Sequence, residues 1–447
     1  MPSFTTDEVR PLDIVSALVR FLDKLDYQDT NLVNFDARFK DLQDCWTLVA
    51  SHFEQRLRNG TLRASPKHVW HAMRTGICFT VCTWAHASLS LLVDMSIFWI
   101  YTVLLDDDSA KDGANLNTGS FVMDLINGTG QQHQVWRLMK EHFPALMSHY
   151  GPFCELTIFR SSLAYVQGCW IESHGILGDR GADLYPTFLR NLTALPEACA
   201  GGLFPKDMFN EEEHLQDMAI LSAQLTPYVN SVNDLLSFYK EVGDDDQVNF
   251  VRAYCRVHGV TMQEALNRVA DDAIHSLEQL RAVFNKETAP AVKAVVDSWM
   301  QGYVTFHFCQ ERYRLSEVYE ECGHTPEEGS FRRWYDIIRS GRPDSSEWAK
   351  PLVLEVVSRN EPKSEIFTHV MGEAELTDSH EILNPVVEEA KLTDTHEILN
   401  PVIGGEKLNK IHEHFTSVVE EEKPSTSPGC CVQVMVGAEL KEDQVQA

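Results

Sequence analysis

The chain has 447 residues, 44% of them hydrophobic and 23% charged, so it can bury a large core and still carry a further segment. Its formal net charge of −28 at pH 7 argues against a general nucleic-acid binder and against attraction to anionic membranes. The 11 cysteines form no C-x-x-C pair, and the first residues, MPSFTTDEVR, lack the pattern of a secretory signal. We therefore expect a cytoplasmic protein with reduced thiols.

Apolar residues recur at helical spacing through most of residues 1–350, and nothing in the first 340 residues keeps the alternation of a strand. Clusters of Gly, Pro and Asp separate the periodic stretches. The predicted helices are residues 13–25, 39–57, 69–85, 88–105, 120–143, 152–174, 185–200, 211–239, 260–284 and 289–319. The pattern predicts an all-α globular body over residues 1–350.

The most apolar run covers residues 86–105, but it contains Asp94 and leads into three aspartates. A buried core helix explains this pattern better than a membrane span, so we expect no stable membrane insertion. An acidic loop is predicted to follow over residues 106–117.

The composition changes at about Pro351. Residues 351–447 contain 19 acidic and 7 basic residues, and a 16-residue repeat starts clearly at Leu376 and Leu392 and more weakly at Leu408 and Asn360. Each unit has one small apolar cluster and cannot bury a core alone. We expect an acidic, largely disordered tail with repeats over about 360–423; the alternative is a tail that docks on the body or on a partner.

The stretch NDLLSFYKE places Asn233, Ser237 and Glu241 at spacings of four, which puts their side chains on one face of a helix. An amide oxygen, a hydroxyl and a carboxylate form a hard oxygen site that suits Mg²⁺. Lys240 lies beside them as a candidate phosphate contact. The alternative is a helix with polar residues on its solvent side.

A second acidic group, Asp106, Asp107 and Asp108, follows the apolar helix. Adjacent carboxylates repel one another and are costly to desolvate without a cation, and the helix dipole disfavours them at a C-terminus. We interpret them as metal ligands facing the first motif across a pocket, with a diphosphate between; the alternative is a solvated helix end.

Cations would complete such a site. Arg190 in YPTFLR and Arg312 with Tyr313 in CQERYRLSE are the candidates. Arg190 has an ordinary alternative as a surface residue, and Arg312 as an ion-pair partner of nearby glutamates.

These stretches resemble the trichodiene synthase family of fungal class I sesquiterpene cyclases. The resemblance covers about residues 10–350 and rests on YTVLLDD, HFPALMSHYGPFC, GCWIE, YPTFLR, VNDLLSFYKE and ERYRLSEVYE, in family order. It implies a class I terpenoid synthase helical bundle, usually a homodimer, with three Mg²⁺ ions and farnesyl diphosphate as substrate. By resemblance, the metal ligands are Asp106, Asp107, Asn233, Ser237 and Glu241, and the diphosphate contacts are Arg190, Lys240, Arg312 and Tyr313.

The aspartate-rich motif departs from the family pattern. In trichodiene-forming members the motif after the apolar helix resembles DDSKD, whereas in this chain it is DDDSAKDG. One register uses Asp106 and Asp107 and places Ala110 where a further Asp would stand; the other uses Asp107, Asp108 and Asp112 with one inserted residue. Both registers stay open, and so does the identity of the terpene product.

Together these features predict ionisation of a prenyl diphosphate and cyclisation of the carbocation in a closed apolar pocket, with Asp106, Asp107, Arg190, Arg312 and Tyr313 as the catalytic residues. Trp99 and Val103 stand near Asp106 on one predicted helix, and Thr305 and Phe308 stand similarly near Arg312, so each is a candidate for the pocket wall or for the plain core. The alternatives are a prenyl chain-elongating transferase and a non-catalytic scaffold of the same fold that acts through its tail.

Overall fold

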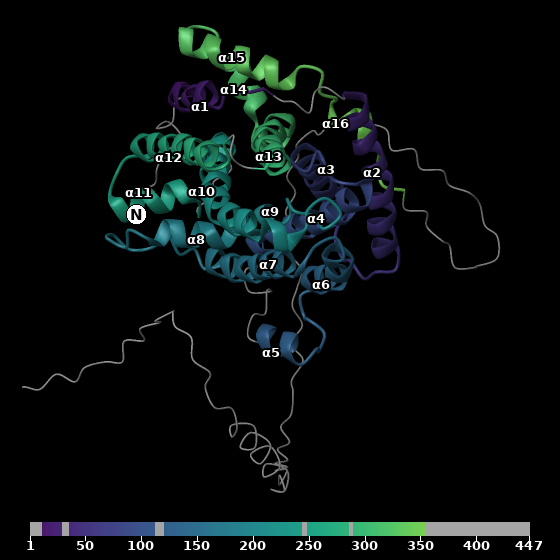
Figure 1. Cartoon of the computed structure of the whole chain (residues 1–447). Coiled ribbons are helices and arrows are strands. Elements are labelled where there is room, and N and C mark those ends of the chain that lie inside the picture. Colours follow the sequence, from purple (N-terminus) through teal and green to yellow (C-terminus); the bar gives the residue numbers. More distant parts are fainter. Residues whose placement is uncertain (1–10, 29–34, 112–119, 244–247, 286–288, 354–447) are drawn as a thin grey trace, which may run out of the picture. The chain divides into compact units, whose positions relative to one another are not determined.

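The computed structural model describes residues 11–28, 35–111, 120–243, 248–285 and 289–353, and within these ranges it consists of helices and loops with no strand (Figure 1). The helices are α1 (Pro11–Leu25), α2 (Phe35–Arg58), α3 (Pro66–Thr83), α4 (Leu89–Lys111), α5 (Phe121–Ile126), α6 (Gln134–Met147), α7 (Pro152–Ser173), α8 (Tyr185–Thr193), α9 (Pro196–Gly201), α10 (Glu211–Gly243), α11 (Phe250–His258), α12 (Met262–Val283), α13 (Pro290–Cys309), the 3₁₀ turn η3 (Glu311–Tyr313), α14 (Leu315–Glu321), α15 (Pro326–Arg339) and α16 (Ser345–Trp348). The predicted all-α class is confirmed.

α4 is a buried helix, as its composition predicts. Phe98, Ile100, Leu104 and Leu105 are each at most 1% exposed, and α4 packs against α2, α3, α6 and α7. The stretch Leu89–Asp107 is long and apolar enough to cross a membrane, but 67% of its apolar window is buried inside the protein. A single helix of this kind also occurs in the cores of proteins that have no membrane span.

α3 lies against both α4 and α13 at very close range. A Cβ atom at Gly76 would stand 2.7 Å from Cγ1 of Ile100, and one at Gly302 would stand 2.0 Å from the carbonyl oxygen of Cys82. Glycine is therefore required at both crossings, because any side chain would push the helices apart. This packing brings α3, α4 and α13 together around the cavity described below.

Several helix starts follow capping rules. Thr261 and Glu264 form a capping box that opens α12, and Thr325 and Glu328 form another that opens α15. Each box satisfies backbone N–H groups that the first turn leaves without partners. Local sequence thus sets where these helices begin.

Two predicted helices are wrong because single residues break them. The expected helix 185–200 divides into α8 and α9 at Leu195, which has φ 47°. The expected helix 289–319 divides into α13, η3 and α14, and Arg314 (φ 57°) stands between the last two. Neither residue is glycine, so the sequence gives little warning of a left-handed backbone there.

Other boundaries also differ from the sequence-based expectation. The predicted acidic loop begins too early, because α4 continues to Lys111. The expected helix 120–143 is two helices, α5 and α6, and the helices α11, α15 and α16 were not predicted.

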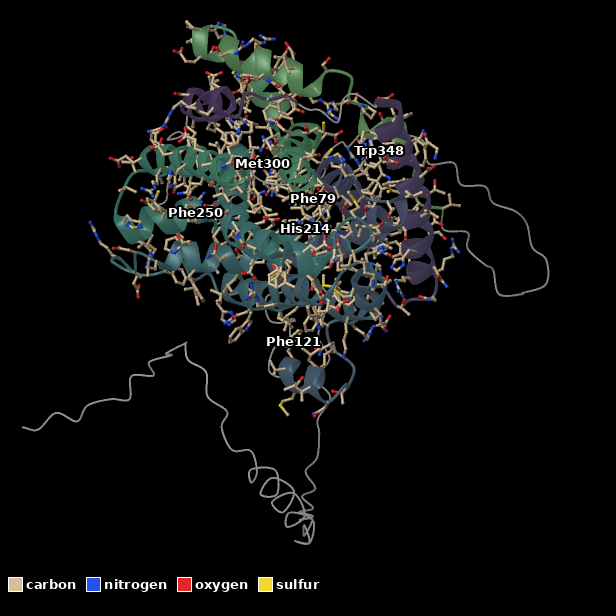
Figure 2. The ribbon with its side chains drawn as sticks, viewed as in Figure 1. Phe79, Phe121, His214, Phe250, Met300 and Trp348 are labelled. Atoms are coloured by element: carbon tan, nitrogen blue, oxygen red, sulfur yellow. The ribbon has the colours of Figure 1, made fainter. Side chains whose placement is uncertain are left out.

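The last described segment returns to the N-terminal half of the chain. Figure 1 shows α15 beside α1 and α16 beside α2. Trp348 of α16 is 3% exposed and its ring centroid lies 5.8 Å from that of Trp46 (Figure 2). The backbone N–H of Val353 donates to Oε1 of Glu54 at 2.8 Å. The repeat tail lies outside the described residues, so its predicted disorder stays a prediction.

Candidate active site

One large cavity, of about 810 Å³, opens between the helices. Residues of α3, α4, α7, α8, α10, α11, α13 and η3 line it. Eleven lining residues are among those selected from the sequence: Trp99, Val103, Asp106, Asp107, Arg190, Asn233, Ser237, Lys240, Glu241, Arg312 and Tyr313. Residues more than 200 positions apart in the chain thus share one cavity.

α10 presents Asn233, Ser237 and Glu241 along one face toward the cavity. The hydroxyl of Ser237 donates to Oε1 of Glu241 at 2.5 Å. Oδ1 of Asn233 accepts a hydrogen bond from Nη2 of Arg190 at 2.5 Å. The three oxygen-bearing side chains are therefore held by neighbours on the same wall.

Asp234, next to Asn233, was not selected from the sequence, although it belongs to the same ND pair. Its Oδ1 lies 2.8 Å from Nε of Arg190, and its side chain is 4% exposed. Burial raises the pKa of Asp234 to about 7, while Arg190 acts in the opposite direction. Burial lowers the pKa of Arg190, but Asp234 and Glu241 outweigh this and raise it. This pair fixes the Arg190 guanidinium at the cavity wall.

His307 on α13 is fully buried and fixes the amide of Asn233. Its Nδ1 lies 2.7 Å from the carbonyl oxygen of Tyr303, so Nδ1–H donates there and Nε2 accepts from Nδ2 of Asn233 at 3.0 Å. Burial lowers the pKa of His307 to about 3, so the ring is neutral at pH 7. Sequence reasoning missed His307, because one histidine in an apolar helix carries no signal of its own.

On the opposite wall, α4 presents Asp106 and Asp107. The hydroxyl of Tyr165 donates to Oδ1 of Asp106 at 3.2 Å, and Nε2 of His68 lies 2.6 Å from Oδ2 of Asp107. The Asp106 side chain is exposed to the cavity. The surrounding protein still desolvates its carboxylate and so raises its pKa, while the positive charge of Arg312 lowers it. His68, another residue that the sequence did not single out, comes from α3.

The aspartate-rich motif lies only partly within the described residues. Asp106 and Asp107 both line the cavity. The Asp108 side chain and Asp112 lie outside the described residues. The register that uses Asp107, Asp108 and Asp112 therefore stays an open alternative.

η3 carries Arg312 and Tyr313 to the cavity between α10 and α13. Tyr313 is 6% exposed, and its ring centroid lies 4.4 Å from that of His307. Burial raises the pKa of Tyr313 to about 12, and Arg312 opposes that shift. Burial lowers the pKa of Arg312, but Tyr313, Asp106 and Asp107 outweigh it and raise it. Arg312 is therefore a positive charge near the α4 carboxylates.

Part of the cavity wall is aromatic. Phe79 and Phe250, labelled in Figure 2, come from α3 and α11, and the ring centroid of Phe79 lies 4.8 Å from Trp99 and 4.9 Å from Phe306. Val103 also lines this cavity.

Two other candidates for the wall do not reach it. Phe308 packs against Phe331 and Tyr335, and Thr305 bonds the hydroxyl of Tyr27 at 2.5 Å and lines a smaller cavity. The helical spacing of the sequence placed Thr305 and Phe308 on one helix with Arg312. This was misleading, because α13 ends before Arg312 and the chain turns at Gln310.

The donor set fits a divalent metal ion shared with other ligands. Among the described residues, no three His, Cys, Asp or Glu side chains form a closed metal site. The candidate ligands are oxygen atoms on two walls, from Asp106 and Asp107 on α4 and from Asn233, Ser237 and Glu241 on α10. An incomplete set of hard oxygen donors leaves places for water and phosphate oxygens, as Mg²⁺ prefers.

A helical bundle around a cavity with an aromatic wall, flanked by candidate oxygen ligands and by arginine and lysine side chains, is typical of the class of terpene cyclases. Comparison with known proteins agrees: the family model described as "Trichodiene synthase (TRI5)" matches residues 11–369. The chain is 37% identical over 341 residues to trichodiene synthase of Stachybotrys chartarum, covering 75% of this chain and 88% of that protein. It is 35% identical over 344 residues to trichodiene synthase of Gibberella zeae, covering 76% and 91%.

The chain belongs to the trichodiene synthase family, and it is a terpene cyclase. This family membership speaks against the chain-elongating and scaffold alternatives. A linalool/nerolidol synthase from Streptomyces clavuligerus, solved with 2-fluorogeranyl diphosphate, is similar at 16% identity and a TM-score of 0.46, covering 59% of this chain and 94% of that one. Terpene synthases generally use divalent metal ions.

Proposed function

We propose that the protein ionises farnesyl diphosphate and cyclises the carbocation to a sesquiterpene, with release of diphosphate. One observation carries this proposal: the acidic oxygen ligands of α4 and α10, four candidate diphosphate contacts and an aromatic wall all line one cavity. The relatives named above as trichodiene synthases support the substrate class.

The diphosphate is held by the chain's own cations. Arg190 and Arg312 come from α8 and η3, Lys240 comes from α10, and the Tyr313 hydroxyl adds a donor. Because Arg190 is fixed by Asp234 and Arg312 lies near Asp106, these charges need little reorganisation when negative charge develops on the leaving group. Preorganised charges of this kind stabilise a transition state more than mobile ones do.

Three Mg²⁺ ions are proposed, held by Asp106, Asp107, Asn233, Ser237 and Glu241 together with water and diphosphate oxygens. When bound, they would supply charge neutralisation for the departing diphosphate.

The rest of the cavity shapes the product. Its aromatic faces, including Phe79, Trp99 and Phe306, each stabilise a passing carbocation by about 1–2 kcal/mol when water is absent. Exclusion of water prevents premature quenching to an alcohol. A trichodiene-like or longiborneol-like sesquiterpene is the proposed product type, and the contour of this wall selects between them.

The test is incubation of the purified protein with farnesyl diphosphate and Mg²⁺, with the organic extract analysed by gas chromatography and mass spectrometry. A cyclic sesquiterpene that disappears with chelator supports the proposal. Unreacted farnesyl diphosphate, with turnover of geranyl or geranylgeranyl diphosphate, would replace the proposed substrate. Cytoplasmic location and a homodimeric state are part of the proposal, and light scattering of the purified protein checks the latter.

A further inference from the structure

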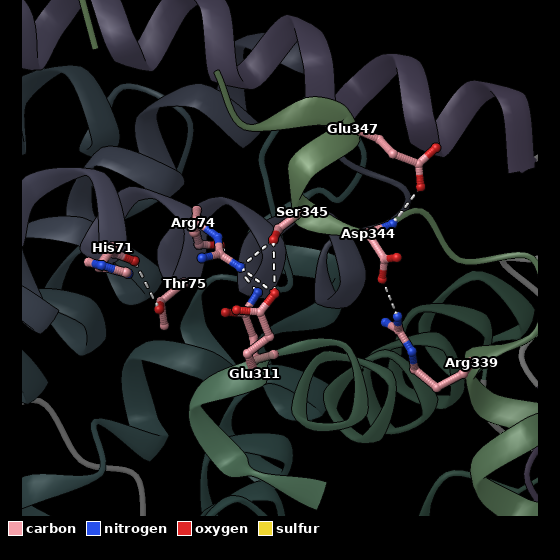
Figure 3. Close-up of polar contacts among 9 residues, drawn as sticks. His71, Arg74, Thr75, Glu311, Arg339, Asp344, Ser345 and Glu347 are labelled. Atoms are coloured by element: carbon pink, nitrogen blue, oxygen red, sulfur yellow. Dashed lines mark hydrogen bonds and ion pairs between the residues drawn. The ribbon is translucent and has the colours of Figure 1, made fainter. Parts of the chain in front are cut away.

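A polar network joins three parts of the chain, next to residues that line the cavity (Figure 3). Arg74 on α3 is 8% exposed, and its Nη2 lies 2.9 Å from Oε1 of Glu311 and also donates to the hydroxyl of Ser345. The same hydroxyl donates to Oε1 of Glu311 at 3.3 Å. α3, η3 and α16 therefore meet at one guanidinium.

The network reaches the residues directly before Arg312. Glu311 is the first residue of η3, and Nε2 of Gln310 donates to the carbonyl oxygen of Arg74 at 3.4 Å. Arg74 is itself held, since its guanidinium carbon lies 4.6 Å over the ring of Trp70. Its neighbours on α3, Thr75 and Gly76, line the cavity. Arg74 thus links the cavity wall to the turn that carries Arg312 and Tyr313.

A second clamp holds the other end of the same turn. Arg314 has φ 57° and donates to both carboxylate oxygens of Glu317, at 2.8 and 2.7 Å. Its guanidinium carbon also lies 5.3 Å over the ring of Tyr239 on α10. A left-handed non-glycine residue is strained, so surrounding contacts must hold it. With Glu311 at one end and Arg314 at the other, η3 is fixed on both sides.

We propose that Arg74 and Glu311 are positioning residues for Arg312 and Tyr313. Ser345 on α16 bonds both Arg74 and Glu311 and so supports the same arrangement. This rests on the proposed function only in assigning diphosphate binding to Arg312. The Glu311 side chain is 74% exposed, so solvent screens its ion pair with Arg74 and the pair contributes little to stability. Its contact with Arg74 therefore sets the direction of the turn more than the stability of the fold.

The test measures binding of inorganic diphosphate, in the presence of Mg²⁺, by calorimetry on the full chain. Glu311→Gln is expected to weaken diphosphate binding about five- to tenfold. Arg74 then loses its charged partner, and η3, which carries Arg312, is held less firmly. The control is Glu320→Gln on the exposed side of α14, which makes the same charge change and leaves binding unaltered. Thermal melts should show both variants folded.

A double-mutant cycle decides whether Glu311 acts through Arg312. In an Arg312→Ala background, Glu311→Gln should have no further effect on diphosphate binding. If Glu311→Gln weakens binding equally in both backgrounds, or does not weaken it at all, the positioning role is wrong.

Two further variants test the other residues of the network, Arg74 and Ser345. Arg74→Lys keeps the charge but loses the planar guanidinium that stacks on Trp70 and whose Nη2 contacts both Glu311 and Ser345. Ser345→Ala removes one bridge. Both variants should weaken diphosphate binding, the first more than the second. Wild-type binding in both would overturn the network. Failure of the wild-type protein to convert farnesyl diphosphate would count against the proposed function instead. The double-mutant cycle would still test the positioning role, because it measures binding of inorganic diphosphate and not turnover.

Discussion

The side chains of His307 and Asn233 meet in a hydrogen bond of 3.0 Å between Nε2 and Nδ2. Because His307 uses Nδ1–H for the carbonyl of Tyr303, its Nε2 must accept, and the amide of Asn233 must present its NH₂ group to the histidine. The amide oxygen then faces Arg190. A neutral, buried histidine therefore fixes the orientation of Asn233, whose amide oxygen is the proposed metal ligand.

Replacement of this histidine should weaken metal binding. His307→Phe keeps the ring packed against Tyr303 and Tyr313 but removes the acceptor that orients Asn233. We expect about a tenfold lower affinity for Mn²⁺, measured by electron paramagnetic resonance, because supporting contacts of this kind tune ligands by that amount.

A second buried histidine serves as the control for this change. His142 lies away from the cavity and contacts the carbonyl oxygen of Asp94 at 2.8 Å. His142→Phe should cost similar stability in a urea melt and leave Mn²⁺ affinity unchanged. Equal Mn²⁺ affinity in both variants would exclude the orienting role of His307.

Removal of a single candidate ligand should abolish most turnover. Glu241→Gln replaces a carboxylate by an amide of the same shape, so the fold is retained while the metal loses a charged donor. Turnover of farnesyl diphosphate should fall about 100-fold, with an unchanged circular dichroism spectrum. Wild-type activity in this variant would remove Glu241 from the ligand set.

The C-terminal segment should divide into a needed part and a dispensable part. A chain that ends at Glu361 keeps α16 and residues up to 353, and it should retain full turnover. A chain that ends at Arg342 loses Ser345 and Trp348, and it should bind inorganic diphosphate less tightly. A folded but inactive chain ending at Glu361 would show instead that the repeat tail belongs to the site.

Stability should fall on acidification because of His52. Its Nε2 accepts from Nε of Arg56 at 2.9 Å and lies 2.8 Å from the hydroxyl of Tyr101. Burial, and then the charge of Arg56, lower the pKa of His52 from 6.5 to about 3. Between these values the unfolded chain binds more protons than the folded one, so the free energy of unfolding decreases as the pH falls below 6.5.

Urea melts at several pH values measure this dependence. His52→Phe should reduce the slope of unfolding free energy against pH by about 1 kcal/mol per pH unit between pH 6 and 4. His275→Phe, at an exposed position on α12, should leave the slope unchanged. A wild-type slope in His52→Phe would show that this histidine is not held neutral.

The sequence predicts those parts of the site that lie on one helix. The spacing of Asn233, Ser237 and Glu241 is enough to place them on one face, and the apolar composition of α4 predicts its burial. Arg190 and Arg312 are different: the need for cations made them candidates, but their spacing alone favours ordinary roles, and the family resemblance supported the assignment.

The parts that could not be predicted are contacts across long separations. His307 and Asn233 are 74 residues apart, and Arg74 and Glu311 are on α3 and η3. No local pattern records such pairs, because each partner looks like an ordinary polar residue in its own segment. The breaks at Leu195 and Arg314 were missed for a related reason, since tertiary contacts impose a backbone that neither residue favours.

The most direct test of the central claim is a crystal structure of the protein soaked with Mn²⁺ and inorganic diphosphate, with the metals located by anomalous scattering. We predict Mn²⁺ beside Asp106 and Asp107 on α4 and beside Asn233, Ser237 and Glu241 on α10. The diphosphate should lie between them, in contact with Arg190, Lys240, Arg312 and Tyr313. Diphosphate bound elsewhere, or bound in this cavity with no metal at α10, would contradict the account.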